Sequence, residues 1–201
     1  GVRAHFCRLS SARSIALIVR ARRAGLPVTA DVALSNLLFI DRDVGSFDPN
    51  YNLLPPLREA HDRRRLRAGI KKREINAVCA SHEPHDADAK ATPFSLSASG
   101  VSIFDIFLPA LLSLVEDNVF DLNTAVAAVS QAPSEILGLD TGTLAHDAPA
   151  DICVFDPRQQ WTVTEDTLVS AGKNTPFLHQ TLRGKVTMTL VEGRIVYNTN
   201  G

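Results

Sequence analysis

The stretch that decides the fold is Ile75-Asn76-Ala77-Val78-Cys79-Ala80-Ser81-His82-Glu83-Pro84-His85. Its first half, residues 75–80, is largely apolar, and its second half is polar and contains a proline. A short apolar run bounded by breaking residues is typical of a buried strand, so we predict a strand over residues 75–80. Ser81 and the two histidines follow the end of that strand and are therefore candidate site residues.

Strand and helix signals alternate along the first two-thirds of the chain. The expected strands cover residues 4–9, 26–32 and 75–80, and the expected helices cover residues 12–24, 59–72, 102–116 and 122–137. Ser10 and Ser11 can cap the first helix, and Gly25 can end it. The first strand–helix–strand unit has the length of a parallel crossover, which indicates an α/β fold.

From Leu139 onward, short β segments separated by Gly and Pro replace this alternation. They cover residues 151–156, 161–163, 181–190 and 194–197, and residues 191–194 have the composition of a hairpin turn. We therefore expect two domains, an α/β domain over residues 1–138 and a β domain over residues 139–201.

Length and composition restrict the class of protein. The 201 residues are 45% hydrophobic, enough for one core, and the net charge of −1 gives no reason to expect nucleic acid or an anionic membrane as partner. The basic run over residues 63–67 has acidic neighbours and is interpreted as a solvated helix face. No apolar run approaches the roughly 20 residues of a membrane span, and the first residues lack the pattern of a signal peptide. The absence of an initial methionine suggests a fragment or a trimmed chain.

The three cysteines, Cys7, Cys79 and Cys153, are far apart and have apolar neighbours. They are expected to be reduced residues of the core, which favours a cytoplasmic protein. Their spacing is too wide for a metal site built on cysteines.

Four segments, in consistent order along the chain, resemble dihydroorotases of the amidohydrolase superfamily. Residues 79–85 are similar to the Asp-His-Ala-Pro-His segment of that family, with Ser81 in place of the aspartate. Residues 48–58, Asp-Pro-Asn-Tyr-Asn-Leu-Leu-Pro-Pro-Leu-Arg, resemble its Asn-Tyr-x-x-Asn-Pro-Pro-Leu-Arg loop. Residues 142–151 and 174–197 resemble the start and the end of its small β domain. Allantoinases share much of the C-terminal pattern and are a weaker match.

The resemblance implies the C-terminal half of a (β/α)₈ barrel, about strands five to eight, followed by a small β-sandwich-like domain. In that family the β domain is built from both termini. The paired histidines of the first strand, and the carboxylated lysine or an equivalent ligand of the metal site, would then lie upstream of this chain.

The resemblance also implies where metal ligands and substrate contacts belong. Arg8 stands at the position of a metal-binding histidine, Ser35 and Asn36 stand in place of a His-His segment, and Ser81 stands in place of the aspartate. Leu54 replaces an asparagine that contacts substrate, and His85 alone is retained, as a vestigial substrate-binding residue.

These replacements have a chemical consequence. Zinc requires neutral imidazole, carboxylate or thiolate ligands, whereas Arg8 is a permanent cation and Ser81 a neutral hydroxyl. We therefore expect no catalytic residue, no metal ligand and no cofactor in this segment, although active relatives bind zinc. A metal site rebuilt from His82 and His85 and a Ser81–His82 nucleophile pair are the less favoured alternatives. Asp105 is interpreted as an acid near a helix N-terminus, where it interacts with the helix dipole.

Two functions remain. The pattern of losses resembles non-catalytic dihydroorotase-like chains of pyrimidine biosynthesis, which implies a hetero-oligomer with the catalytic chain of aspartate carbamoyltransferase. The alternative is an active amidohydrolase, of dihydroorotase or allantoinase type, that hydrolyses a cyclic amide with an altered metal site.

Overall fold

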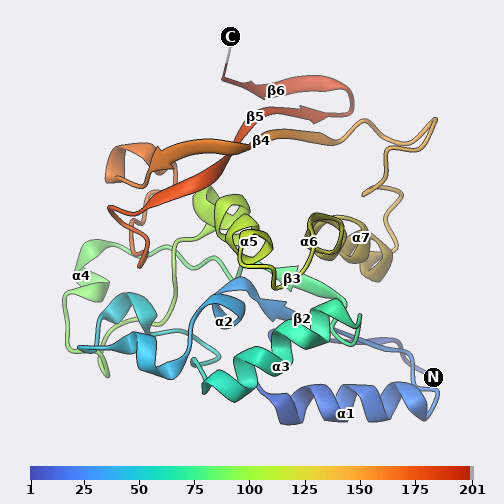
Figure 1. Cartoon of the computed structure of the whole chain (residues 1–201), viewed down its shortest axis with the longest axis horizontal. Helices are drawn as coiled ribbons and strands as arrows, with labels where there is room; N and C mark the ends of the chain where they lie inside the picture. Colours follow the sequence, from blue (N-terminus) through green and yellow to red (C-terminus); the bar gives the residue numbers. More distant parts are fainter. Residues whose placement is uncertain (200–201) are drawn as a thin grey trace.

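The computed structural model describes residues 1–199 and contains two sheets of three strands each (Figure 1). The first sheet is parallel, with neighbouring strands β1 (Ala4–Phe6), β2 (Val28–Ala33) and β3 (Ala77–Cys79). The second is antiparallel, with neighbouring strands β4 (Ile152–Thr162), β5 (Thr181–Val191) and β6 (Arg194–Asn198).

Seven α-helices accompany the strands of the described residues. They are α1 (Ala12–Arg23), α2 (Leu34–Leu38), α3 (Ala60–Lys71), α4 (Ala87–Lys90), α5 (Phe107–Glu116), α6 (Leu122–Val129) and α7 (Gln131–Leu137). Four 3-10 helices cover Asp41–Val44, Pro49–Tyr51, Phe104–Ile106 and Glu165–Thr167. No helix among residues 1–199 is long and apolar enough to cross a membrane.

Helix α1 begins and ends where the sequence predicts. The Ser11 hydroxyl accepts a hydrogen bond from the Ser14 backbone N–H at 3.2 Å, which satisfies one of the free donors of the first turn. After the last turn, Gly25 adopts a φ of +79°, a conformation that glycine takes without steric cost. The Glu192–Gly193 turn between β5 and β6 likewise has positive φ at both residues, as the predicted hairpin requires.

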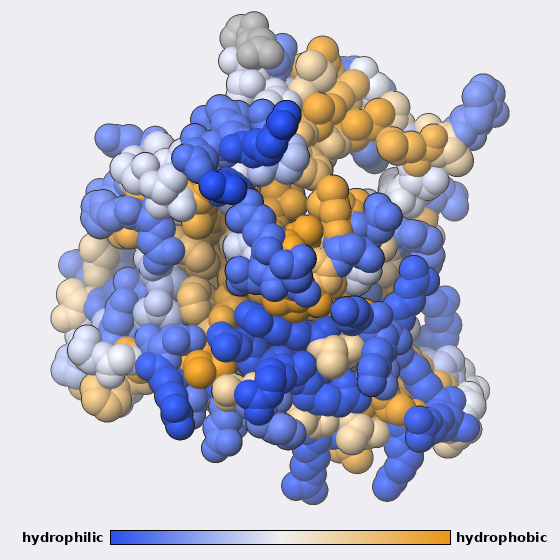
Figure 2. All heavy atoms as spheres, in the orientation of Figure 1, coloured by the Kyte–Doolittle hydropathy of each residue, from blue (hydrophilic) through white to orange (hydrophobic). Residues whose placement is uncertain are grey.

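The core lies on one face of the parallel sheet, which we call the outer face. Its strand residues Ala30, Val32 and Val78 are buried together with apolar side chains of α1 and α3, such as Ile15 and Leu66. Helices α1 and α3 cover this face, whereas α5 and α6 lie between the parallel strands and the antiparallel sheet (Figure 1). Figure 2 shows hydrophilic side chains over α1 and α3 and hydrophobic ones gathered between α5, α6 and the antiparallel sheet.

The antiparallel sheet packs on α5 through a close contact at Gly184. A Cβ on Gly184 would lie 2.5 Å from Leu112 Cδ1, and the Trp161 indole N–H donates to the Gly184 carbonyl at 3.0 Å. Val163 and Phe177 belong to the same cluster of buried side chains as the parallel sheet. The division into domains at residue 139 therefore stays a prediction, since one core joins both segments.

The structure differs from the sequence-based expectations in three elements. The described residues contain three parallel strands, where about strands five to eight of a barrel were expected. They contain a single three-stranded antiparallel sheet rather than two facing sheets, so a sandwich is not formed within residues 1–199. The helix expected over residues 122–137 breaks at Ser130, because the ring of Pro133 in a continuous helix would clash with the carbonyl of Val129.

The expectation that all cysteines are core residues is wrong. Cys7 and Cys153 are exposed and Cys79 is partly buried, although all three are free. Apolar neighbours in a strand do not say which face a residue occupies, and Cys7 follows an edge strand.

Candidate functional site

The residues expected at the family's metal-ligand positions come together at the carboxyl end of the parallel strands. Arg8 follows β1, Ser35 and Asn36 lie in α2 directly after β2, and Ser81 follows β3. Because parallel strands end at the same edge, these residues meet although they are far apart in sequence. The Arg8 Nη1 atom lies 3.2 Å from the Leu54 carbonyl oxygen and 3.5 Å from Ser81 Oγ.

We call this group the mouth cluster; it consists of Arg8, Ser35, Asn36, Leu54, Ser81 and Glu83. All of its members except Arg8 line one small hollow with about 10 Å³ of free space, enough for about one water-sized group. The guanidinium of Arg8 lies beside this hollow and 3.9 Å from the Glu83 carboxylate.

Two members of the mouth cluster have unusual backbone conformations. Arg8 has a φ of +57° and Ser81 a φ of +50°, the left-handed region that non-glycine residues adopt at a cost of about 1 kcal/mol each. Each residue stands two positions after the end of a strand, and the two side chains meet at 3.5 Å. The strain is therefore located where the two side chains meet.

The mouth cluster does not fit zinc. It offers one guanidinium, hydroxyls, an amide and a single carboxylate, and that carboxylate is paired with Arg8. Zinc sites in proteins use imidazole, thiolate and carboxylate ligands, and a cation inside the site opposes a second one. We therefore derive no metal-dependent step at this position.

A second group of polar side chains lies on the face of the parallel sheet opposite the outer face. We call this face the inner face. The register places His5, Thr29, Asp31 and Cys79 on this face. The Asp31 carboxylate is buried and accepts three hydrogen bonds: from His5 Nε2 at 2.8 Å, from the Arg8 backbone N–H at 2.7 Å and from the Cys79 thiol at 3.2 Å. The Thr29 hydroxyl pairs with His5 Nδ1 at 2.8 Å. Burial, beside Asp31, raises the pKa of the Cys79 thiol to about 12, so this thiol stays protonated.

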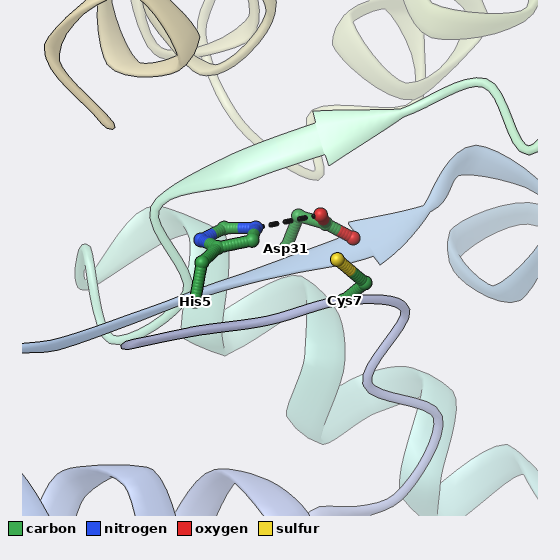
Figure 3. A group of neighbouring side chains, drawn as sticks. All are labelled: His5, Cys7 and Asp31. Carbon is green, nitrogen blue, oxygen red and sulfur yellow. Dashed lines mark hydrogen bonds and ion pairs between the residues drawn. The ribbon is translucent and has the colours of Figure 1, made fainter. Parts of the chain in front are cut away.

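The inner face also holds a group of possible metal ligands that the sequence analysis missed. His5, Cys7 and Asp31 have ligand atoms that all lie within 4.8 Å of one another, and Figure 3 shows the three side chains converging from two strands. The signal in the sequence is the alternation His5-x-Cys7 next to Asp31, which becomes visible only once the parallel register is known. Both Asp31 oxygens already accept hydrogen bonds and both His5 ring nitrogens have partners, so these two side chains are paired without a metal.

His82 does not pair with Ser81 as a base. Its Nδ1 atom accepts hydrogen bonds from the backbone N–H groups of Ile103 at 3.0 Å and Phe104 at 3.2 Å, and its ring stacks on Phe104 with centroids 4.2 Å apart. Burial lowers the pKa of His82, which keeps the ring neutral as this acceptor role requires. The side chain therefore orders the segment that leads into α5.

His85 is held by the loop that follows β3. Its Nε2 atom lies 2.8 Å from the Ser99 carbonyl, and its backbone N–H donates to Asn174 Oδ1 at 2.7 Å. The Asn174 amide also donates to the carbonyls of Glu83 and Gly100, so one buried side chain fixes this loop. A substrate-binding role for His85, and the loss of one at Leu54, stay predictions.

Asp105 lies near a helix N-terminus and also binds a segment distant in sequence. It accepts hydrogen bonds from the Val169 N–H, the Ser170 N–H and the Ser170 hydroxyl, at 3.1, 3.2 and 2.7 Å. Burial alone would raise the pKa of Asp105, but these hydrogen bonds outweigh it and lower the pKa. The carboxylate thus joins the start of α5 to the segment before β5.

Comparison with known proteins shows to which family this chain is related. A family model described as "Amidohydrolase family" matches residues 113–197. Dihydroorotase-like proteins of Pseudomonas aeruginosa and Pseudomonas putida are 42% and 43% identical over 197 residues, and a dihydroorotase of Geotalea daltonii is 35% identical over 193 residues. The chain belongs to the amidohydrolase family. Its relatives there are dihydroorotases and dihydroorotase-like proteins, and the matches cover 96–98% of the chain but only 45–46% of each relative.

Solved structures agree with the fold. An L-hydantoinase (dihydropyrimidinase) from Arthrobacter aurescens superimposes with a TM-score of 0.91 at 22% identity, over 98% of this chain and 45% of the other. A dihydropyrimidinase from Brevibacillus agri gives a TM-score of 0.84 at 23% identity, over 96% of this chain and 44% of the other. At such identities the likeness shows the fold alone, which is part of an amidohydrolase barrel.

Proposed function

We propose that the chain comes from a dihydroorotase-like protein of pyrimidine biosynthesis that does not hydrolyse its family's substrate. One observation carries the proposal: at all three ends of the parallel strands, the side chains at the expected metal-ligand positions include none of the imidazole, carboxylate or thiolate groups that bind zinc in proteins. These side chains are Arg8, the Ser35–Asn36 pair and Ser81. The two relatives with the highest identities quoted above are also named dihydroorotase-like rather than dihydroorotase.

The chemistry of these side chains supports inactivity. Metal-dependent hydrolysis of a cyclic amide uses a cation to activate water and a carboxylate to take its proton. The Ser81 hydroxyl cannot take a proton at neutral pH, and it already accepts from Arg8. The Arg8 charge would oppose a divalent cation by several kcal/mol at an effective dielectric constant of about 20.

We further propose a structural role, in a cytoplasmic hetero-oligomer with the catalytic chain of aspartate carbamoyltransferase. The resemblance to non-catalytic dihydroorotase-like chains motivates this partner. The fold supports it as well: the chain retains the barrel core without the metal-ligand side chains, and a folded protein without catalytic residues can still bind a partner through its surface. No nucleic-acid or membrane partner is proposed.

The inner face favours a second candidate function. His5, Cys7 and Asp31 together offer three zinc-ligand types within 4.8 Å, so an active amidohydrolase with a displaced metal site has a specific set of residues to use. This candidate requires that the metal break the Asp31 hydrogen bonds and bind the Cys7 thiolate.

The test uses the full-length protein, co-expressed with the aspartate carbamoyltransferase chain of the same organism. Dihydroorotate hydrolysis is measured on the purified product, and its mass by light scattering. We expect no turnover and a mixed complex, with the carbamoyltransferase chain expressed alone as the control for mass. Turnover that Cys7→Ser abolishes would support the second candidate, and separate elution of the two chains would contradict the proposed partner.

A further inference from the structure

We infer that the mouth cluster binds a small carboxylate, with the Arg8 guanidinium in the place of the lost cation. This inference deepens the proposed function, since it rests on the proposal that the side chains at the strand ends do not bind a metal. It does not depend on the proposed protein partner.

The first argument is a buried hydroxyl without a hydrogen-bond partner. Ser35 is 2% exposed and its hydroxyl makes no hydrogen bond among residues 1–199, and the neighbouring Asn36 is 3% exposed. A buried polar group left without a partner costs about 1–3 kcal/mol. Both residues line the hollow, so a ligand oxygen placed there would remove this cost.

The second argument is the free donor capacity of Arg8. Within residues 1–199, its side-chain hydrogen bonds and its ion pair all involve Nη1, so the Nε and Nη2 donors are available. The side chain is 39% exposed, which leaves it open to a ligand from solvent. A guanidinium presents its donors as a planar fork that matches the two oxygens of a carboxylate.

Size and charge select the class of ligand. The free space of about 10 Å³ admits about one oxygen atom, so only one end of a ligand can enter between Ser35, Asn36 and Ser81. A single cation with Glu83 3.9 Å away favours a singly charged anion over a phosphate dianion. A carboxylate meets both conditions: one oxygen enters the hollow while the other stays on Arg8.

The experiment uses the full-length protein with acetate as the probe and acetamide as its neutral isostere. Binding is measured by saturation-transfer NMR and by thermal unfolding at constant ionic strength, with chloride as the competing salt. We expect acetate alone to bind and to raise the unfolding temperature. Equal effects of acetate, acetamide and chloride would overturn the inference.

Variants locate the site. Arg8→Gln should weaken acetate binding about tenfold or more, as the loss of charge-assisted hydrogen bonds does, and Arg8→Lys should weaken it less. Ser35→Ala should weaken it by a smaller factor, while Glu83→Gln should tighten it by removing a competing charge. Arg13→Gln, at an exposed position of α1, is the matched control and should change nothing. Unchanged affinity in Arg8→Gln, with the folded state verified by circular dichroism, would contradict the assignment.

Dihydroorotate turnover and zinc content of the same samples separate the two possible failures. An inactive, zinc-free protein that does not bind acetate would overturn this inference alone. A zinc-containing, active protein would overturn the proposed function as well.

Discussion

The inner face of the three parallel strands and the mouth cluster at their carboxyl ends differ in how their polar groups are paired. On the inner face, Asp31 accepts three hydrogen bonds and His5 has a partner on each ring nitrogen. At the mouth, the buried Ser35 hydroxyl has no partner in the described chain. Folding alone favours complete pairing of buried polar groups, so the inner face has the properties of structural support. The mouth instead leaves a buried hydroxyl unpaired, which makes it available to a ligand.

The largest expected effect tests the structural half of this comparison. Asp31→Ala removes the acceptor of His5, of the Arg8 backbone N–H and of the Cys79 thiol, so we expect a loss of about 3 kcal/mol in the free energy of unfolding. Urea denaturation of the full-length protein measures it. Asp147→Ala is the control, because the Asp147 side chain is 88% exposed and should change stability by less than about 0.5 kcal/mol. Equal losses in both variants would show that the inner face is not a structural network.

A smaller loss is expected in the loop that supports the mouth. Asn174→Ala removes the side chain that joins His85, Glu83 and Gly100, and should cost about 2 kcal/mol. Asn123→Ala, at an exposed position of α6, is the matched control. The same denaturation measurement applies, and a loss no larger than that of Asn123→Ala would show that the loop is held by other contacts.

Ser35→Ala should behave in the opposite way. The variant removes an unpaired buried hydroxyl, so without added carboxylate we expect a gain of up to about 1 kcal/mol. Ser134→Ala provides the comparison: that hydroxyl is also buried but pairs with the Ser130 carbonyl and with Thr141, so its loss should cost about 1 kcal/mol. Calorimetric unfolding of both variants decides, and a clear loss in Ser35→Ala would mean that the hydroxyl has a partner in the full-length protein.

The smallest effect concerns pH. Burial lowers the pKa of His82 below its ordinary value of 6.5, so the folded protein resists a proton that the unfolded chain accepts. The His82 contribution to stability is therefore complete above about pH 6.5 and is progressively lost as the pH falls below it. Stability measured from pH 7.5 to 5 should fall less steeply in His82→Gln than in the unchanged protein, and the exposed His61→Gln should leave the slope unaltered. Identical slopes in all three proteins would contradict this assignment.

Local chemistry in the sequence predicted much of the fold. Serines before α1, Gly25 after it and the Glu192–Gly193 turn all appear where short-range rules place them. The sequence pattern did not predict the break at Ser130, because the apolar residues continue at helical spacing across it. The signal for the break is Pro133. Exposure of Cys7 and Cys153 depends on which face a strand buries, which neighbouring residues do not reveal.

For the candidate site, the sequence identified the residues but not how their polar atoms are paired. The resemblance named Arg8, Ser35, Asn36 and Ser81, and the structure brings them to one edge. The pairing of their polar atoms depends on distances that a sequence does not contain. The Asp31 network was missed for the same reason: it arises from the register of three strands that are separated by long connections.

The zinc content of the full-length protein, purified in the presence of zinc and then dialysed, tests the central claim most directly. A mouth with Arg8 and Ser81 at the ligand positions predicts no stoichiometric zinc by elemental mass spectrometry. About one zinc per chain or more that survives dialysis would contradict the account. Its loss in Cys7→Ser, but not in Cys153→Ser, would place the metal on the inner face.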